Sequence, residues 1–282
     1  MSSASPRVGV LGHIEWVQFA SVEHVPLAGE VAHASDPFEE PCGGGAVAAV
    51  QLVRLAGRAA LVTAGGDDEI GRRSLARLGD LGVEVRSAVL DAPTRRALTL
   101  LDRDGERTIT TLGPRLQPHG AVHGHQLAAL DGADAVYVTA GDEAAVRAAR
   151  ESSRVLVASP RARGALAHGI RLDALVLSGA DEIEVDDAAD ARAEAEVVVV
   201  TEGARGGTWK RRTGESGRWE PATPPGPRVD VFGCGDSFAA GLTYGLGAGM
   251  SLQDALALAA RCGAVCLTGR GPYERQLAAA DL

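Results

Sequence analysis

Lysine is almost absent from this chain. Its 282 residues include 28 basic side chains, and Lys210 is the only lysine among them. A phosphate-binding loop of the Gly-x-x-x-x-Gly-Lys type therefore does not occur, and neither does the Val-Ala-Ile-Lys motif of protein kinases. A Schiff-base mechanism would have to use Lys210, which stands in a polar, turn-rich stretch. The sequence thus excludes the P-loop fold and argues against a lysine nucleophile.

Long apolar runs, a basic excess and a dense set of cysteines are also missing. No apolar run reaches the ~18 residues that a membrane-spanning helix needs. Four cysteines in 282 residues are too few for a disulfide scaffold. The net charge of −9 and the scattered tryptophans oppose a nucleic-acid-binding surface. The chain begins without the basic and then apolar layout of a secretion signal, so we expect a cytoplasmic protein that binds neither nucleic acid nor membranes.

Short apolar runs alternate with amphipathic segments along most of the chain. With 45% hydrophobic and 23% charged residues, the composition is that of an ordinary globular protein. Runs typical of buried strands are residues 7–11, 59–64, 135–139, 155–158, 174–177 and 197–201. Segments typical of helices are residues 45–55, 70–81, 143–150, 235–246 and 252–267. This order predicts an α/β fold with a mostly parallel sheet covered by helices on both faces.

Two stretches interrupt the alternation. Residues 22–35 and 83–112 have the pattern of short strands and turns, with no convincing helix. Within the second, the turn at 102–106 joins two strand-like runs and predicts a hairpin. We expect residues of about 13–40 and 84–112 to form a small sheet beside the main one. Residues 1–6 are expected to be a flexible tail, and 7–282 one folded domain.

The strongest candidate for chemistry is the segment Asp230-Val-Phe-Gly-Cys-Gly-Asp-Ser-Phe-Ala-Ala-Gly241. The two glycines around Cys234 permit a sharp turn, and a helix is expected to begin at about Asp236. Backbone amides at a helix amino terminus bind anions, and a carboxylate at the same turn can accept a proton from a hydroxyl group. Phosphoryl transfer needs both of these parts. The alternative is a plain turn in which Asp236 only caps the helix.

The residues around this turn resemble the ribokinase-like (PfkB) family of sugar and nucleoside kinases. That family has the signature Asp-Thr-x-Gly-Ala-Gly-Asp-x-Phe-x-x-Gly, and this chain has Val231 in place of the threonine and Cys234 in place of the alanine. Segments 42–46, 61–71 and 198–207 also resemble family motifs, in the same order. The resemblance implies a three-layer sandwich with a central, mostly parallel sheet and a small β lid. The matching positions are Asp230, Gly233, Gly235, Asp236, Phe238 and Gly241.

The resemblance also implies an activity: transfer of the γ-phosphoryl group of ATP to a hydroxyl of a sugar or sugar-like molecule. Asp236 would be the general base. The turn formed by Gly233, Cys234 and Gly235, with the amide of Asp236, would hold the transferred phosphoryl group. The residues implied on the nucleotide side are Ser178, Thr201, Gly203, Ala204 and Gly206.

Two cations follow from the same resemblance. The family uses an Asn-x-x-Glu motif to organise Mg²⁺ and phosphates, and the matching stretch here runs from Ser178 to Asp181. Asp181 keeps a carboxylate, so it is the expected Mg²⁺ residue. Some members hold a monovalent cation near the turn that corresponds to Asp230, so K⁺ is a further expectation.

Substrate recognition departs from the family pattern. The first strand of the family usually leads to an aspartate that binds sugar hydroxyls, and Val17 stands at that position here. We expect Glu15 to take over, with His13 as a second choice, because a carboxylate can accept hydrogen bonds from a diol. The alternative is a solvated Glu15 beside Trp16 and Val17 packed under the lid.

The glycine cluster departs from the family as well. The common family form is Gly-Gly-Lys-Gly-Ala-Asn, and this chain has Gly44 for the lysine and Val47 for the asparagine. Gly43, Gly44 and Gly45 still allow close approach of the backbone to a ligand. Arg95 and Arg96 precede the hairpin, and Arg96 is our candidate for holding an acidic or phosphorylated substrate. The alternative for these arginines is a charged edge strand that resists aggregation.

Two other functions stay open at this point. A nucleoside kinase would need apolar walls around a base, which Trp16 and Phe19 could supply. A sugar- or nucleotide-binding regulatory protein without turnover would explain the losses at Val17, Gly44 and Val47, although the intact Asp236 argues against it. Because the lid of this family is often a dimer surface, the resemblance also implies a homodimer.

Overall fold

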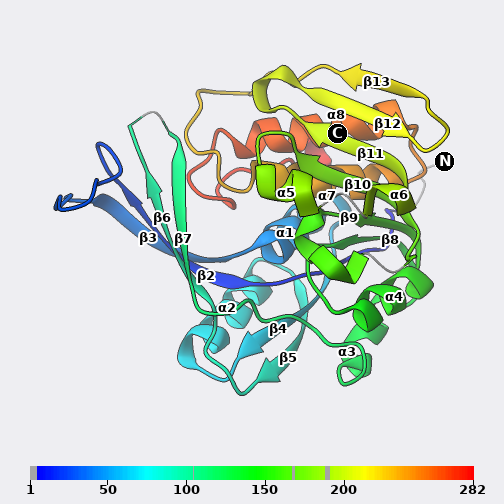
Figure 1. The fold of residues 1–282 in the computed structure, drawn as a ribbon, viewed down its shortest axis with the longest axis horizontal. Coiled ribbons are helices and arrows are strands. Elements are labelled where there is room, and N and C mark those ends of the chain that lie inside the picture. Colours follow the sequence, from blue (N-terminus) through cyan, green and yellow to red (C-terminus); the bar gives the residue numbers. More distant parts are fainter. Residues whose placement is uncertain (1–4, 104, 167–168, 188–190) are drawn as a thin grey trace.

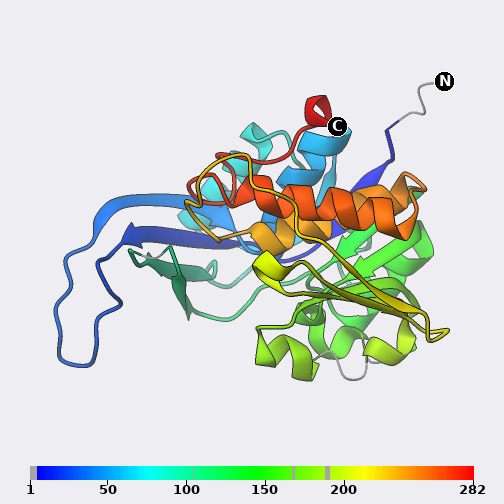
Figure 2. The ribbon, with the colours of Figure 1, turned by 90° about the horizontal axis from the view of Figure 1, so that it is seen from above.

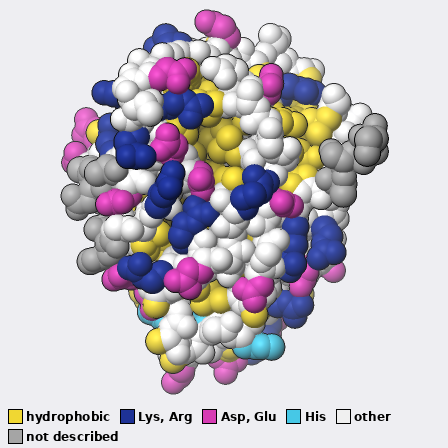
Figure 3. All heavy atoms as spheres, turned by 90° about the vertical axis from the view of Figure 1, so that its right-hand side faces the viewer, with side chains coloured by type: hydrophobic (Ala, Val, Ile, Leu, Met, Phe, Trp, Pro, Cys, Tyr) yellow, Lys and Arg dark blue, Asp and Glu magenta, His cyan; other side chains and the backbone are white. Residues whose placement is uncertain are grey.

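The structure, a computed structural model, describes residues 5–103, 105–166, 169–187 and 191–282 (Figure 1). Residues 1–4 of the expected tail lie outside this part of the chain, whereas Pro6 is already buried. No helix in the described ranges is both long and apolar enough to cross a bilayer. On the face drawn in Figure 3, cationic and anionic side chains are interspersed rather than segregated.

A nine-stranded sheet forms the centre of the described chain. The pairing is parallel from β5 through β11, and β12 and β13 add an antiparallel edge. The inner strands are almost fully buried, as expected for a parallel sheet covered on both faces. In sheet order, the strands are β13 (Ser216–Trp219), β12 (Gly207–Arg211), β11 (Ala195–Thr201), β10 (Leu172–Ser178), β9 (Ser153–Ala158), β8 (Ala133–Val138), β1 (Val8–Leu11), β4 (Ala60–Gly66) and β5 (Glu84–Leu90).

Helices cover both faces of this sheet, which gives the three layers expected from the sequence (Figures 1 and 2). One apolar core lies under α1 (Gly44–Ala56), α2 (Glu69–Asp80), α7 (Cys234–Gly247) and α8 (Leu252–Cys266). The second lies under α3 (Gly124–Leu127), α4 (Glu143–Ser152) and α6 (Ala191–Glu194), with α5 (Glu182–Asp187) beside them. Short 3₁₀ turns occur at η1 (Ala128–Leu130), η2 (Pro160–Leu166), η3 (Gly203–Arg205) and η4 (Ala279–Asp281).

A four-stranded sheet projects from one side of the main body (Figure 2). Its order is β3 (Ser35–Cys42), β2 (Glu15–Ser21), β6 (Arg96–Leu101) and β7 (Arg107–Leu112). The predicted hairpin is confirmed, with Leu101 opposite Arg107. Two boundaries were wrong. Residues 22–34 form the loop between β2 and β3 rather than strands, and residues 84–90 pair with β4 in the main sheet.

Aromatic side chains dock this small sheet onto the turn that precedes α7. Phe19 stacks on Phe38 with ring centroids 4.4 Å apart, and its ring also meets Phe232 edge-on at 4.9 Å. Arg107 of β7 donates a hydrogen bond to the carbonyl of Val231 over 3.2 Å. The small sheet and the turn therefore share one contact surface.

Candidate active site

The amino termini of α1 and α7 meet at Asp236. Gly43 and Gly233 are the N-cap residues of these helices, with φ angles of 89° and 82° that favour glycine. A Cβ atom on Gly44 would lie 2.9 Å from Oδ1 of Asp236 and 3.1 Å from Oγ1 of Thr139. Glycine at position 44 therefore leaves the space that the carboxylate of Asp236 occupies.

Backbone amides at the start of α7 point to an anion site. The amide of Ser237 is already bonded to the carbonyl of Gly233 over 2.8 Å, and that of Cys234 reaches Val231 over a long 3.4 Å. Within the described residues, no backbone carbonyl accepts from the amides of Gly235 and Asp236. Gly235 is exposed and faces open space. These two amides are available to a phosphoryl oxygen at the positive end of the helix dipole.

The carboxyl group of Asp236 has the electrostatic setting of a base. Burial raises its pKa above the ordinary value, and the guanidinium groups of Arg161 and Arg107 oppose that rise. A carboxylate with a raised pKa is a stronger proton acceptor than an ordinary aspartate. Since the group must be deprotonated to act, the two arginines favour the form that accepts a proton.

Asp230 fixes the turn rather than facing solvent. It is 2% exposed, and its two carboxylate oxygens accept hydrogen bonds from the amides of Phe232 at 2.8 Å and Gly271 at 3.0 Å. Asp230 therefore joins the turn before α7 to the loop at Gly271. These contacts explain a structural role for Asp230, and its role in binding K⁺ stays a prediction.

The expected Mg²⁺ residue is engaged by the protein itself. Oδ1 of Asp181 accepts from the amides of Ile183 and Glu184 at 3.1 and 3.2 Å, and Oδ2 lies 3.6 Å from Arg161. Glu184, which sequence reasoning missed, pairs with Arg161 at 2.7 Å. Among the described residues, no group of three or more His, Cys, Asp or Glu side chains is arranged to hold a metal ion. The role of Asp181 in binding Mg²⁺ stays a prediction.

Glu15 is buried beside Arg95 at the start of the small sheet. It is 9% exposed, and its Oε2 lies 3.3 Å from Nε of Arg95. Burial raises the pKa of Glu15, and the charge of Arg95 opposes the rise. The solvated alternative for Glu15 was wrong, although Trp16 and Val17 are packed as that alternative required. The charge of Asp236 also raises the pKa of Glu15, so the two carboxylates lie near each other.

His13 lies beside the amino terminus of α1. Its Nδ1 lies 3.2 Å from Oγ1 of Thr139, and a Cβ atom on Gly43 would be 3.2 Å from its Nε2. Burial, together with neighbouring arginines, lowers the pKa of His13 well below its usual range. His13 is therefore a neutral ring that can exchange hydrogen bonds with a hydroxyl group. Gly45 packs against the backbone of His13, which explains a glycine there.

The residues expected on the nucleotide side end two neighbouring parallel strands. Ser178 and Thr201 are paired in register, and the amide of Gly179 donates to the carbonyl of Thr201 over 2.9 Å. Gly203 and Ala204 follow in η3. Glycine at position 206 has a structural explanation of its own, because a Cβ atom there would lie 2.2 Å from the carbonyl oxygen of Trp219.

Two arginines near the site were not singled out by the sequence pattern. Arg161 follows β9, and its charge acts on Asp236, while Arg115 follows β7 and donates to the carbonyl of Arg161 over 2.7 Å. Ligands of open parallel sheets bind beyond the carboxyl ends of the strands, so the place of Arg161 three residues after β9 is a signal that could have identified it. Arg96, our earlier candidate, is exposed, whereas its neighbour Arg95 contacts Glu15.

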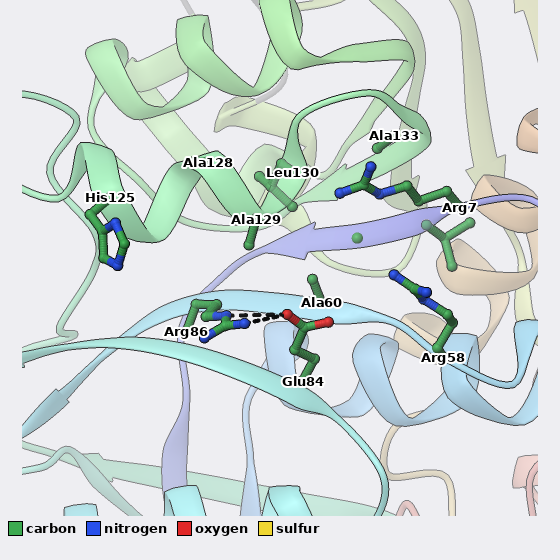
Figure 4. Close-up of a pocket in the computed structure, with 12 residues that line it drawn as sticks. Arg7, Arg58, Ala60, Glu84, Arg86, His125, Ala128, Ala129, Leu130 and Ala133 are labelled. Carbon is green, nitrogen blue, oxygen red and sulfur yellow. Dashed lines mark hydrogen bonds and ion pairs between the residues drawn. The ribbon is translucent and has the colours of Figure 1, made fainter.

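A pocket of about 280 Å³ lies at the opposite end of the main sheet (Figure 4). Its lining includes Arg7, Arg58 and His125, together with Arg86, which is already hydrogen-bonded to Glu84. Neither Asp236 nor the glycine turns contribute to it. The candidate site at the carboxyl ends of the strands is therefore defined by converging side chains and amides.

The main sheet, the small flanking sheet and the glycine turn at α7 are features of a ribokinase-like α/β protein. The chain belongs to the pfkB family of carbohydrate kinases, whose defining pattern matches residues 6–278. The resemblance found in the sequence is thus confirmed, and the chain is a transferase of the carbohydrate-kinase type.

Individual relatives agree with this assignment. A fructokinase of Klebsiella pneumoniae is 30% identical over 282 aligned residues, which cover 84% of this chain and 91% of that protein. The ribokinase of Arabidopsis thaliana, solved with ribose and ATP, matches with a TM-score of 0.75 at 19% identity, over 98% of this chain and 97% of that one. Phosphofructokinase-2 of Escherichia coli, solved with potassium, matches with a TM-score of 0.73 at 18% identity, over 98% of this chain and 96% of that one. These structures establish the fold.

The contact between Gly44 and Asp236 generates a test. We expect Gly44→Ala to reduce kcat by about 100-fold, since displacing a catalytic group by ~1 Å has costs of that order. The matched control is Gly79→Ala in α2, where an added Cβ meets nothing within 4 Å. Both variants would be compared by steady-state kinetics and thermal unfolding. A Gly44→Ala enzyme with wild-type kcat would contradict the assigned geometry.

Proposed function

We propose that this chain is an ATP-dependent sugar kinase in which Asp236 removes the proton from the acceptor hydroxyl. The observation that carries the proposal is the position of Asp236. Its carboxylate has a raised pKa and sits in the first turn of α7, beside the available amides of Gly235 and Asp236 itself. A base and an anion site are thereby aligned on one point, as phosphoryl transfer requires.

The proposed reaction is an in-line transfer. The carboxylate of Asp236 accepts the hydroxyl proton, and the acceptor oxygen forms a bond to the γ-phosphorus of ATP. The bond between that phosphorus and the bridging oxygen breaks, which releases ADP. The amides at the start of α7 stabilise the charge on the migrating group. Mg²⁺ bound to ATP would neutralise further negative charge on the phosphates.

A cytoplasmic location of the protein stays a prediction.

The aromatic side chains support a sugar rather than a nucleoside as the acceptor. Trp16 is 6% exposed, and the guanidinium carbon of Arg73 lies 4.5 Å from the centroid of the Trp16 ring. Phe19 is 1% exposed and is used in the stack with Phe38 and Phe232. Neither ring is available to cover a base. A non-catalytic binding protein has no need for the base at Asp236.

Exposed apolar residues support a homodimer through the small sheet. Leu98, Ile109 and Leu112 are 39%, 41% and 47% exposed, and all six residues of β7 are exposed. In the described chain β7 pairs with β6 alone, so its outer edge has unpaired backbone groups. A second copy of this sheet would cover both features.

The base is tested by Asp236→Asn. We expect kcat to fall by about 100- to 10,000-fold, which is the range for loss of a general base, while ligand binding is retained. Acceptor-dependent ADP release and calorimetric titration with acceptor would separate the two effects. Asp80→Asn, at the exposed end of α2, is the matched control. Undiminished turnover in Asp236→Asn would reject Asp236 as the base.

The electrostatic setting of Asp236 predicts a pH effect. Arg107 opposes the rise in the pKa of Asp236, so Arg107→Gln should raise that pKa further. Because only the ionised carboxylate accepts a proton, the acidic limb of the kcat/KM profile should move to higher pH. The control is Arg103→Gln, an exposed residue in the same hairpin. An unchanged acidic limb in Arg107→Gln would show that Arg107 does not act on the base.

The dimer is tested by Ile109→Arg on the exposed face of the small sheet. We expect the wild-type protein to be a dimer in light scattering after gel filtration, and Ile109→Arg to be a monomer, because a buried unpaired charge opposes association. The control is Val89→Arg in β5, an exposed residue at the edge of the main sheet, and this variant should remain dimeric. A wild-type monomer would remove this part of the proposal.

A further inference from the structure

Arginine side chains from three separate segments converge beside Glu15 and His13. Arg95 precedes β6, Arg115 follows β7, and Arg161 lies in η2 after β9. Arg95 approaches Glu15 to 3.3 Å, Arg115 donates a 2.7 Å hydrogen bond to the carbonyl of Arg161, and the charges of all three act on His13. The two ends of the small sheet therefore meet the main sheet at a concentration of positive charge.

Among the described residues, the carboxylates nearby are paired with Arg95 and Arg161 and not with Arg115. Arg161 is paired with Glu184 and Asp181. Arg95 faces Glu15, but its Nε is buried and makes no well-directed hydrogen bond within the described residues. In that same part of the chain, no carboxylate forms an ion pair with Arg115.

Arg115 is the least compensated member of the cluster. Burial and, to a smaller extent, the charges of Arg163, Arg95 and Arg161 together lower its pKa to about 10, while the charge of Glu15 acts in the opposite direction. A half-buried cation among other cations costs free energy unless an anion joins it. Ionisable groups with strongly shifted pKa values that gather beside a catalytic carboxylate are typical of binding sites.

The cluster lies in the neighbourhood of the base. Glu15 senses the charges of Arg95 and Arg115 and also that of Asp236. His13, whose pKa is lowered by burial and then by these arginines, contacts Thr139, and Thr139 lines the same space beside Gly44 as Asp236. The arginines and the base therefore act on one common residue, Glu15, and belong to one site.

We propose that the phosphoryl acceptor is an anionic sugar derivative, whose carboxylate or phosphate group is bound by Arg95 and Arg115 while a free hydroxyl faces Asp236. A neutral sugar would leave Arg115 without a counter-charge and the buried Nε of Arg95 without a well-directed acceptor. An oxyanion can accept charge-assisted hydrogen bonds from both of them. This inference rests on the proposed kinase function and specifies the acceptor of that same site.

The test is a panel of acceptors assayed by ADP release from MgATP. Neutral pentoses and hexoses are compared with sugar acids and with sugar monophosphates of the same chain length. We expect an anionic acceptor to have the highest kcat/KM, by about 100-fold over its neutral counterpart, as two charge-assisted contacts allow. Preference for the carboxylates identifies a sugar acid, and preference for the phosphates identifies a sugar phosphate.

Variants connect the preference to the two arginines. Arg115→Gln should raise KM for the anionic acceptor by about 10- to 100-fold with little change in kcat, and should leave KM for a neutral sugar unchanged. Arg115→Lys should recover part of the loss, which a purely structural defect would not show. Arg54→Gln, at the exposed end of α1, is the control.

The outcomes separate this inference from the function on which it rests. A neutral sugar as the best acceptor, with a KM that Arg115→Gln does not change, would overturn the anionic acceptor and leave the kinase intact. An absence of ADP release with every acceptor would overturn both. Equal effects of Arg115→Gln on neutral and anionic acceptors would also overturn the inference, because they would show a role in folding.

Discussion

The structure depends on one close contact, in which the carboxylate of Asp236 occupies the space that a side chain at Gly44 would fill. Two helices reach this point with their amino termini, and both dipoles favour negative charge there. Burial opposes ionisation of the same group. The position of the base is therefore a compromise between burial, which strengthens it, and the helix termini and arginines, which keep it charged.

The small sheet is coupled to that base through its own packing. Phe19 and Phe38 stack, Phe232 packs against Phe19, and Phe232 belongs to the turn that leads into α7. On the far side of the turn, Asp230 ties Phe232 to the loop at Gly271. A displacement of the small sheet would be transmitted to the turn, so the sheet is suited to close over an acceptor and to exclude water from the reaction.

The sequence predicted well what local patterns determine. The parallel strands, the hairpin at residues 102–106 and the turn before α7 follow from apolar runs and glycine positions within short windows. The sequence did not predict the sheet to which a strand belongs where that depends on pairing with a strand distant in the chain. Residues 84–90 have the same strand pattern as the hairpin, and only their partner, β4, places them in the main sheet.

The same limit applies to the site. Arg95 and Arg96 are adjacent and chemically equal, and the contact with Glu15 distinguishes them in three dimensions. Arg115 gains its significance from Arg161, a residue more than forty positions away, to whose carbonyl it donates. Charge clusters of this kind arise from topology, so no spacing rule along the chain could identify them.

The separation of the base from the arginine cluster has an evolutionary consequence. Asp236 and Gly44 are coupled in this chain, because a Cβ atom at position 44 would meet the carboxylate of Asp236. Arg95 and Arg115 lie instead where chain segments enter and leave the small sheet, and their side chains can change without moving a helix terminus. A lineage built on this scaffold could acquire new acceptors by drift at the sheet boundaries while the chemistry of transfer stays fixed.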